Sequence, residues 1–285
     1  MTPNLSSFED QKSPTPPPTF TDSPNRMSSG PSSPVPTGSP EPQRQFVIVP
    51  PDQQFHSRSA PSNLHPYIRP LTISDLESCI ALENAAFTDP GERATREKVR
   101  QQLKNGDFNM GTKCGELCLG IFTTVVPGTT DFKAETLAAA RPVETSRKNG
   151  AVSVLLGHVV AAKTEAPVAT DESMDYPRDW NSEHPKPSNL GHQEQGRTIV
   201  LHSVAVLPRF QGRGIGQVLM KAYIAQMNGA GIVDRLALIA HDHKVTWYET
   251  LGFTNKGSSK AQFGGGGWFD MVYEMKPIEA RARYG

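Results

Sequence analysis

The residues best suited to chemistry lie in one short segment, residues 201–217, which reads LHSVAVLPRFQGRGIGQ. Its first half has the apolar, β-branched character of a strand, and glycines 212, 214 and 216 follow directly before an amphipathic helical pattern. Glycine lets the backbone approach a ligand closely, and the N–H groups of a first helical turn lack intrahelical acceptors. The segment therefore predicts a site for an anion such as a pyrophosphate, to which Arg213 would add charge.

The glycine spacing narrows the kind of ligand. It fits neither the Gly-x-x-x-x-Gly-Lys-Ser/Thr pattern of nucleoside triphosphatases nor the Gly-x-Gly-x-x-Gly pattern of dinucleotide-binding folds. It does match Gln/Arg-x-x-Gly-x-Gly/Ala at Gln211, Gly214 and Gly216. In this feature the sequence resembles the GNAT superfamily of N-acetyltransferases, whose loop of this pattern holds the diphosphate of acetyl-coenzyme A (acetyl-CoA).

Further motifs make the resemblance more specific. Over about residues 65–276 the chain is similar to arylalkylamine (serotonin) N-acetyltransferases and their fungal polyamine-acetylating relatives. The shared motifs are RPLT at 69–72, ENAAF at 83–87, LHSVAV at 201–206 and WYETLGF at 247–253. The resemblance implies a single α/β (α+β) domain with a GNAT-like mixed, mostly antiparallel sheet flanked by helices, and acetyl-CoA in a cleft where two neighbouring strands splay apart. The cofactor-binding residues it implies are Val204, Ala205, Val206, Gln211, Gly212, Arg213, Gly214, Ile215, Gly216 and Gln217.

His202 occupies the position where family members carry a catalytic base that often acts through water. A primary alkylamine is cationic at neutral pH and only its neutral form attacks a thioester, so a group titrating near neutrality has to accept the proton. Family members have a second histidine two residues earlier on the same strand face, where this chain has Val200. His202 is therefore expected to act alone, with water or with another group, and the alternative is a half-buried histidine that only packs.

Tyr248 matches the tyrosine that the family uses as a proton donor. The departing CoA thiolate needs a proton, and a phenol, with a pKa of about 10, is protonated at neutral pH. A residue three positions after Val245 and three before Leu251 could instead serve packing alone.

Glu83 is the third catalytic candidate, and the case for it comes from helical spacing. The apolar arc of a helix beginning near Ser74 consists of Leu76, Cys79, Ile80, Ala86 and Phe87. Glu83 falls inside this arc. Because a buried unpaired carboxylate is costly, Glu83 either lies at the open end of the arc or meets a cation. It is expected to bind the amine or to assist His202.

The elements that would position these residues alternate along the chain. Helices are expected over 74–87, 95–104, 215–227 and 244–251, and strands over 67–71, 116–126, 151–164, 198–206, 236–240 and 268–275. The strands 116–126 and 151–164 would form a long hairpin. Such alternation is typical of an α/β domain, placed at 65–280.

Two polar segments lack periodicity and are predicted to be disordered. Fifteen of the 25 prolines precede residue 67, in a tail over 1–64, and residues 165–197 would loop out as an insertion. Residues 281–285 form a short tail. Residues 58–61 lie where vertebrate relatives carry a phosphorylation site that recruits an adaptor protein, although the match is poor.

Composition argues against several partners. Lys plus Arg and Asp plus Glu both number 29, so no net field favours nucleic acid or an anionic membrane. The longest apolar run, 151–162, is shorter than the ~20 residues of a membrane helix, and no secretory signal is visible, so a cytoplasmic location is expected. Cys79, Cys114 and Cys118 lack zinc or redox spacing, and no metal site is expected at residues 241–243.

Together these features predict direct acetyl transfer from acetyl-CoA to a small primary amine, without a covalent enzyme intermediate. An arylalkylamine such as serotonin, tryptamine or tyramine ranks first. A polyamine ranks second because the acidic insertion could bind several ammonium groups, and protein amino groups are a further rival. The alternatives from other classes are a catalytically weak CoA-binding regulator, which Val200 favours, and a phosphoprotein scaffold acting through the tail.

Overall fold

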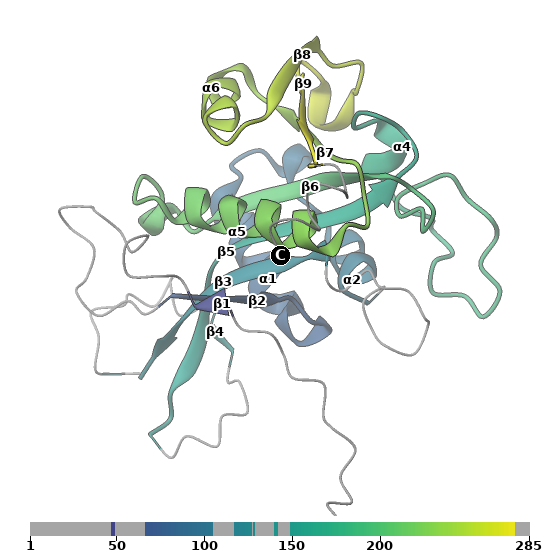
Figure 1. Cartoon of the computed structure of the whole chain (residues 1–285). Helices are drawn as coiled ribbons and strands as arrows, with labels where there is room; N and C mark the ends of the chain where they lie inside the picture. The colour runs from purple at the N-terminus through teal and green to yellow at the C-terminus, as the bar shows by residue number, and fades with distance from the viewer. Residues whose placement is uncertain are drawn as a thin grey trace, which may run out of the picture. The chain divides into compact units, whose positions relative to one another are not determined.

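The computed structural model of the chain describes residues 47–48, 66–104, 117–126, 128, 140–141 and 149–276, all within one compact unit. Their strands form one mixed sheet in the order β1-β2-β3-β5-β6-β7-β9-β8, with β4 beside β5 (Figure 1). Every neighbouring pair is antiparallel except β6 and β7. The predicted mixed, mostly antiparallel sheet is thereby confirmed.

The elements agree closely with those expected from the sequence. The strands are β1 (Val47–Ile48), β2 (Tyr67–Pro70), β3 (Leu119–Val125), β4 (Ala140–Arg141), β5 (Val152–Thr164), β6 (Thr198–Val206), β7 (Arg235–Ala240), β8 (Thr254–Ser258) and β9 (Phe269–Glu274). The helices are α1 (Leu76–Ala86), α2 (Arg96–Lys104), α4 (Asp171–Met174), α5 (Ile215–Ala230) and α6 (Asp242–Thr250), with short 3₁₀ turns that include η3 (Pro90–Glu92) and η7 (Phe263–Gly265). The β3–β5 hairpin is confirmed, whereas β8 and α4 were not expected.

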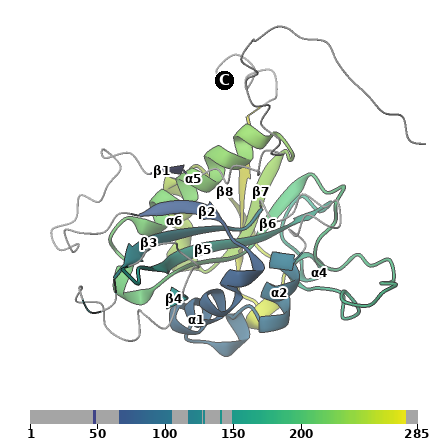
Figure 2. The same ribbon diagram turned by 90° about the horizontal axis from the view of Figure 1, so that it is seen from below.

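Helices cover both faces of the sheet. Figure 2 shows α5 on one side of β3, β5 and β6, and α1 and α2 on the other. The buried residues of α5, among them Leu219, Tyr223 and Met227, repeat at the spacing of one helical face, which explains why α5 packs on the sheet as it connects β6 to β7. The α1–α2 side is the one that carries the polar groups described below.

The strands β6 and β7 separate soon after they meet. They pair only at Thr198 with Arg235, Ile199 with Leu236 and Val200 with Ala237. Beyond these pairs β6 continues to Val206, and no other strand of the described residues pairs with it on that edge. A ligand lying along this edge could bond its backbone groups. This is the predicted splay between neighbouring strands.

A β-bulge lies at the centre of β6. Val160 of β5 pairs with Ser203 and Ala161 pairs with Leu201, so His202 is the extra residue of the bulge. His202 contacts Gln102 on α2 and Ser203 contacts Glu83 on α1, so both side chains reach helices on the same face of the sheet. Strict alternation would have placed them on opposite faces.

Residues 165–197 differ from the disorder that their composition suggested. They contain α4, whose first turn is closed by a reciprocal capping box between Thr170 and Ser173. Ala169 and Met174 pack with Val200 in a small apolar cluster at the β6–β7–β9 junction. Local capping and two buried apolar side chains order this segment, and neither produces a periodic signal.

Several expectations fall on other parts of the chain. The predicted tail over 1–64, apart from β1, the residues 281–285, the adaptor site at 58–61 and Cys114 all lie outside the described residues. Among the residues that are described, no helix is both long and apolar enough to cross a bilayer.

Candidate active site

A cavity of about 890 Å³ opens where β6 and β7 separate. Residues 201–206 of β6 form one wall and residues 238–241, at the end of β7, form another. The loop before α5, the helix α6 and the connection between α1 and α2 complete it. The predicted base His202 and the predicted acid Tyr248 both line this cavity, although they are 46 positions apart in the sequence.

The glycine-rich loop has the backbone geometry that an anion site requires. Gly212 and Gly214 adopt φ angles of 69° and 81°, a left-handed region that glycine enters without steric cost. Gly214 is the N-cap of α5, so the N–H groups of the following turn point out of the helix end. Gln211 Nε2 donates to Val206 O at 2.9 Å and ties the loop to the end of β6. The arrangement suits a diphosphate.

Most of the predicted cofactor residues line this cavity, and two do not. Those that line it are Val204, Ala205, Val206, Gln211, Gly212, Gly214, Gly216 and Gln217. The side chain of Ile215 is 1% exposed and belongs to the core, and Arg213 is absent from the cavity wall.

His202 is held at the cavity wall in its neutral form. Its ring is buried, with Nδ1 in contact with Gln102 Nε2, and Nε2 has no hydrogen-bond partner among the described residues. Burial and the positive charge of Lys98 hold the pKa of His202 well below 6.5. The neutral ring can accept a proton. The amide of Gln102 can also lie in the orientation rotated by 180°. Its Oε1 would then accept from Nδ1–H of His202, and Nε2 of the His202 ring would be the atom that accepts the proton.

Tyr248 both packs against neighbouring rings and lines the cavity, and its role as a proton donor stays a prediction. Its ring packs edge-on against Trp247 at 4.8 Å and Phe253 at 5.5 Å between centroids, and it also lines the cavity. Burial raises the pKa of its hydroxyl above the usual value near 10, so the group carries its proton at neutral pH.

Glu83 is not where a catalytic carboxylate was expected. It is 1% exposed and does not line the cavity. Oε1 accepts from His158 Nε2 at 2.7 Å and from the hydroxyl of Ser203, and Oε2 accepts from Ala94 N at 2.9 Å. Burial raises the pKa of Glu83, but these hydrogen bonds outweigh it and leave the pKa lowered. Glu83 therefore joins α1 to β5, β6 and the segment before α2. The expectation that it binds the amine or assists His202 stays a prediction, and its contacts point to a structural role.

The far end of the cavity carries groups that sequence reasoning missed. Asp89 and Glu92, from the connection between α1 and α2, line it together with Trp268. Glu92 Oε1 lies 2.8 Å from His241 Nε2, and the His241 ring packs on Trp268 at 4.0 Å between centroids. No spacing in the sequence links residues 92, 241 and 268, because they meet only when three connections converge.

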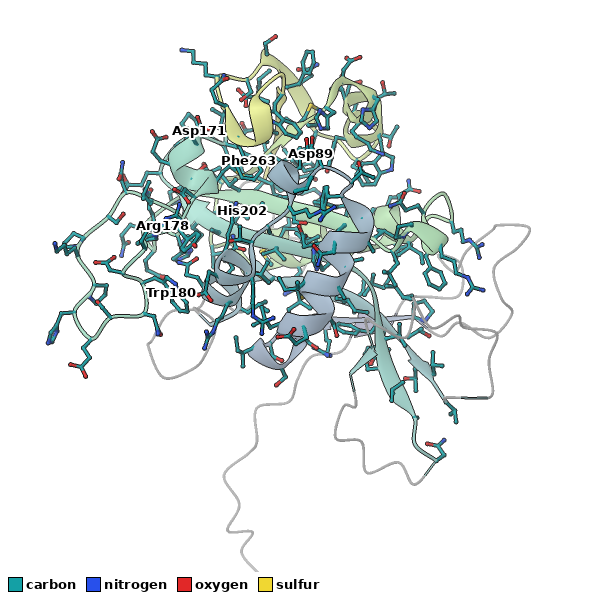
Figure 3. All side chains as sticks on the ribbon, turned by 180° about the vertical axis from the view of Figure 1, so that it is seen from behind. Asp89, Asp171, Arg178, Trp180, His202 and Phe263 are labelled. Atoms are coloured by element: carbon teal, nitrogen blue, oxygen red, sulfur yellow. The ribbon has the colours of Figure 1, made fainter. Side chains whose placement is uncertain are left out.

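The 165–197 segment supports the same end of the cavity. Met174 of α4 lines it, and the Asp171 carboxylate accepts from the backbone N–H groups of Gln262 and Phe263, both at 2.9 Å. Figure 3 shows Asp171, Phe263 and Asp89 gathered above His202. A segment expected to loop out thus helps to build the site.

Thiol and metal chemistry find little support among the described residues. Burial raises the pKa of Cys118 to about 11 and that of Cys79 well above its usual value. Neither lines the cavity, and the described residues contain no group of three or more potential metal ligands. His241 is the N-cap of α6, and Asp242 is its first residue.

Comparisons with known proteins agree with this geometry. Residues 188–275 match a family model described as an acetyltransferase (GNAT) domain. Over 75 residues the chain is 35% identical to serotonin N-acetyltransferase of Mesocricetus auratus, a stretch that covers 26% of this chain and 36% of that protein. The chain therefore spans about a third of the curated relative that it matches.

Solved structures of low similarity were also found. The loading GNATL domain of CurA from Lyngbya majuscula has a TM-score of 0.46 at 13% identity, covering 73% of this chain and 97% of that one. The ribosomal-protein-S18-alanine N-acetyltransferase from Escherichia coli has a TM-score of 0.40 at 13% identity, covering 75% and 96%. At these scores the fold assignment rests on the strand order and helix placement given above.

The family match spans β6 to β9 and so includes the separated strands, the glycine-rich loop and Tyr248. This part of the chain, residues 188–275, is similar to the GNAT acetyltransferase domain.

Proposed function

We propose that this protein is an acetyl-CoA-dependent N-acetyltransferase that acts on a small primary amine, with an arylalkylamine as the preferred substrate. One observation carries the proposal: the glycine-rich loop at the start of α5, His202 and Tyr248 line one cavity between β6 and β7. An anion-binding helix end, a neutral base and a protonated hydroxyl are the groups that acetyl transfer from a phosphate-bearing thioester needs.

The cofactor would bind along β6. Its diphosphate suits the N–H groups at the start of α5, which carry the positive end of the helix dipole. Its extended arm suits the edge of residues 201–206, because β7 leaves that edge unpaired. This places the acyl end toward His202, on the bulge.

In the transfer step, the ammonium group of the acceptor gives its proton to His202, directly or through water. The neutral nitrogen then attacks the thioester carbonyl, so that a C–N bond forms and the C–S bond breaks. Proton transfer from a phenol to a CoA thiolate is uphill by about 2 kcal/mol at ordinary pKa values of about 10 and 8.5. We therefore assign Tyr248 a hydrogen bond to the sulfur. As the C–S bond breaks, the second proton of the attacking nitrogen passes through this hydroxyl to the thiolate, so that Tyr248 ends protonated and the neutral CoA thiol leaves.

Neither described cysteine suits an acetyl-cysteine intermediate, which favours direct transfer. The nucleophilic form of cysteine is the thiolate, and burial disfavours that form at Cys79 and Cys118. Neither sulfur lines the cavity.

The acceptor end favours an amine that carries an aromatic ring. Its wall offers the rings of Phe87, Phe263 and Trp268, together with the carboxylates Asp89 and Glu92. A ring attached to one ammonium group would use both kinds of surface. A polyamine is the second candidate, because two carboxylates lie within one short segment and could bind two ammonium groups.

The test is release of CoA thiol from acetyl-CoA with tryptamine, tyramine, spermidine, putrescine and a lysine peptide in parallel. The highest kcat/KM is expected for tryptamine or tyramine, and Glu92→Gln should raise the amine KM while leaving the acetyl-CoA KM unchanged. Glu77→Gln, an exposed carboxylate on α1, is the matched control. Binding of acetyl-CoA by calorimetry without thiol release with any amine would identify a regulator and refute the enzyme.

A further inference from the structure

The base His202 lacks the neighbouring histidine that its strand would need for a relay. Val200, two residues earlier, is fully buried in the apolar cluster with Ala169 and Met174. A polar neighbour of His202 must therefore come from another element. The nearest candidates are on α2, where Lys98 and Gln102 are both about 4% exposed.

These two residues share one face of α2. They are four positions apart, which places their side chains one above the other along a helix. Gln102 contacts His202 Nδ1, so the face that carries Lys98 is turned toward the same ring. Lys98 Nζ has no hydrogen-bond partner among the described residues and lies 4.6 Å from the centroid of Phe263, a wall of the cavity.

An ammonium group in such a place is costly unless nearby charges stabilise it. Burial lowers the pKa of Lys98 to about 8, against the attraction of Asp175 and Glu83, with Arg178 adding repulsion. Lys98 is therefore mostly charged at pH 7.

The charges that act on His202 come from two elements. Burial lowers the pKa of His202 most. Lys98 on α2 and then His192 in the 165–197 segment lower it further, and the backbone of Ser173 on α4 raises it slightly.

We propose that Lys98 is a positioning residue for proton transfer: its ammonium group keeps the imidazole of His202 neutral, while Gln102 orients the ring. The inference rests on the proposed function for its catalytic meaning. A neutral ring is free to take the proton of the acceptor amine. Once it has done so, two cations face each other at the cavity wall, and their repulsion drives the proton from His202 to solvent water and resets the base. The pair then holds one positive charge between turnovers.

The experiment follows the imidazole directly. The full chain, labelled with ¹³C and ¹⁵N histidine, is titrated by NMR without any cofactor, and the His202 signals are assigned with His202→Gln. In Lys98→Met the pKa of His202 should rise by about one unit, the lower end for a like charge nearby. In Lys98→Arg it should stay low. Lys221→Met, on α5 across the sheet, is the matched control and should change nothing.

The same variants are then assayed for acetyl transfer. The acid limb of kcat/KM against pH should move upward in Lys98→Met by the same amount. The wild-type protein supplies a check that needs no variant of Lys98: the His202 signal should show a second inflection near pH 8, where Lys98 loses its proton.

An unmoved His202 titration in a folded Lys98→Met protein overturns the inference, as does a wild-type titration with no inflection near pH 8. Should Lys98→Met fail to fold, the wild-type inflection decides the matter. A shifted titration in a protein that releases no thiol would leave the charge pair standing and refute the proposed function instead.

Discussion

Replacing Glu83 with Gln tests whether this carboxylate is a structural joint. Glutamine has nearly the same shape but only one acceptor oxygen. That oxygen can accept either from Ala94 N or from His158 and Ser203, and the amide nitrogen takes the other place. One buried donor then loses its partner, at a cost of about 1–3 kcal/mol. The bonds from His158 and Ser203 also lose the assistance of a charge, roughly half their strength. The expected loss of unfolding free energy is about 2–4 kcal/mol.

The pH dependence has a definite sign. The folded-state pKa of Glu83 is lowered, so its ionised form stabilises the fold above the unfolded-state pKa, near 4.3, and this contribution is lost as pH falls through the folded-state pKa. The difference between wild type and Glu83→Gln should therefore be full at pH 7 and should shrink below about pH 4.

Urea denaturation at pH 7 and at pH 3 measures this difference, with Glu77→Gln as the control. Glu77 lies on the same helix and pairs with Arg96 of α2 at the surface, where solvent screens such a pair and its contribution to stability is small. If Glu83→Gln is as stable as wild type at pH 7 but loses kcat, the carboxylate works in catalysis and the structural assignment is wrong.

Three further predictions concern the cavity. Tyr248→Phe should lower kcat by about 10²-fold with the acetyl-CoA KM unchanged, measured by thiol release; an unaffected kcat would leave Tyr248 only a packing role. Gly214→Ala places a side chain at φ 81°, so it should lower the free energy of unfolding by about 1–2 kcal/mol in chemical denaturation and should weaken acetyl-CoA binding. Gly216→Ala is the control: its Cβ would lie 3.4 Å from Trp247, and stability and acetyl-CoA binding should both be kept. Asp171→Ala removes the acceptor of the Phe263 N–H and should raise the amine KM; an equal rise in the acetyl-CoA KM would argue for a general loss of structure.

Much of the fold was predictable because its signals are local. The strand over 198–206 was placed at its observed bounds, and the helix from Ile215 was placed at its observed start, since apolar periodicity and glycine punctuation are written in consecutive residues. The short α4 and β8 escaped because capping and edge pairing leave little periodic trace.

The candidate site divides along the same line. His202, Tyr248 and most of the glycine-rich loop were found from motifs, and all of these line the cavity. Glu83 was rightly expected to need a partner in the core, but its partners His158 and Ser203 come from two strands that no helical wheel contains.

The amino-acid order alone thus pointed to the glycine-rich loop, His202 and Tyr248 as the candidate site, because each was recognised from residue type at short spacing. Folding in three dimensions selected what surrounds them: the bulge that turns both His202 and Ser203 to the α1–α2 face, the contact of Gln102 with the imidazole, and the pairing of Glu92 with His241. The last two contacts join residues 100 and 149 positions apart in the sequence. Their energies depend on burial and on short distances between polar groups, and only the folded chain brings these groups together.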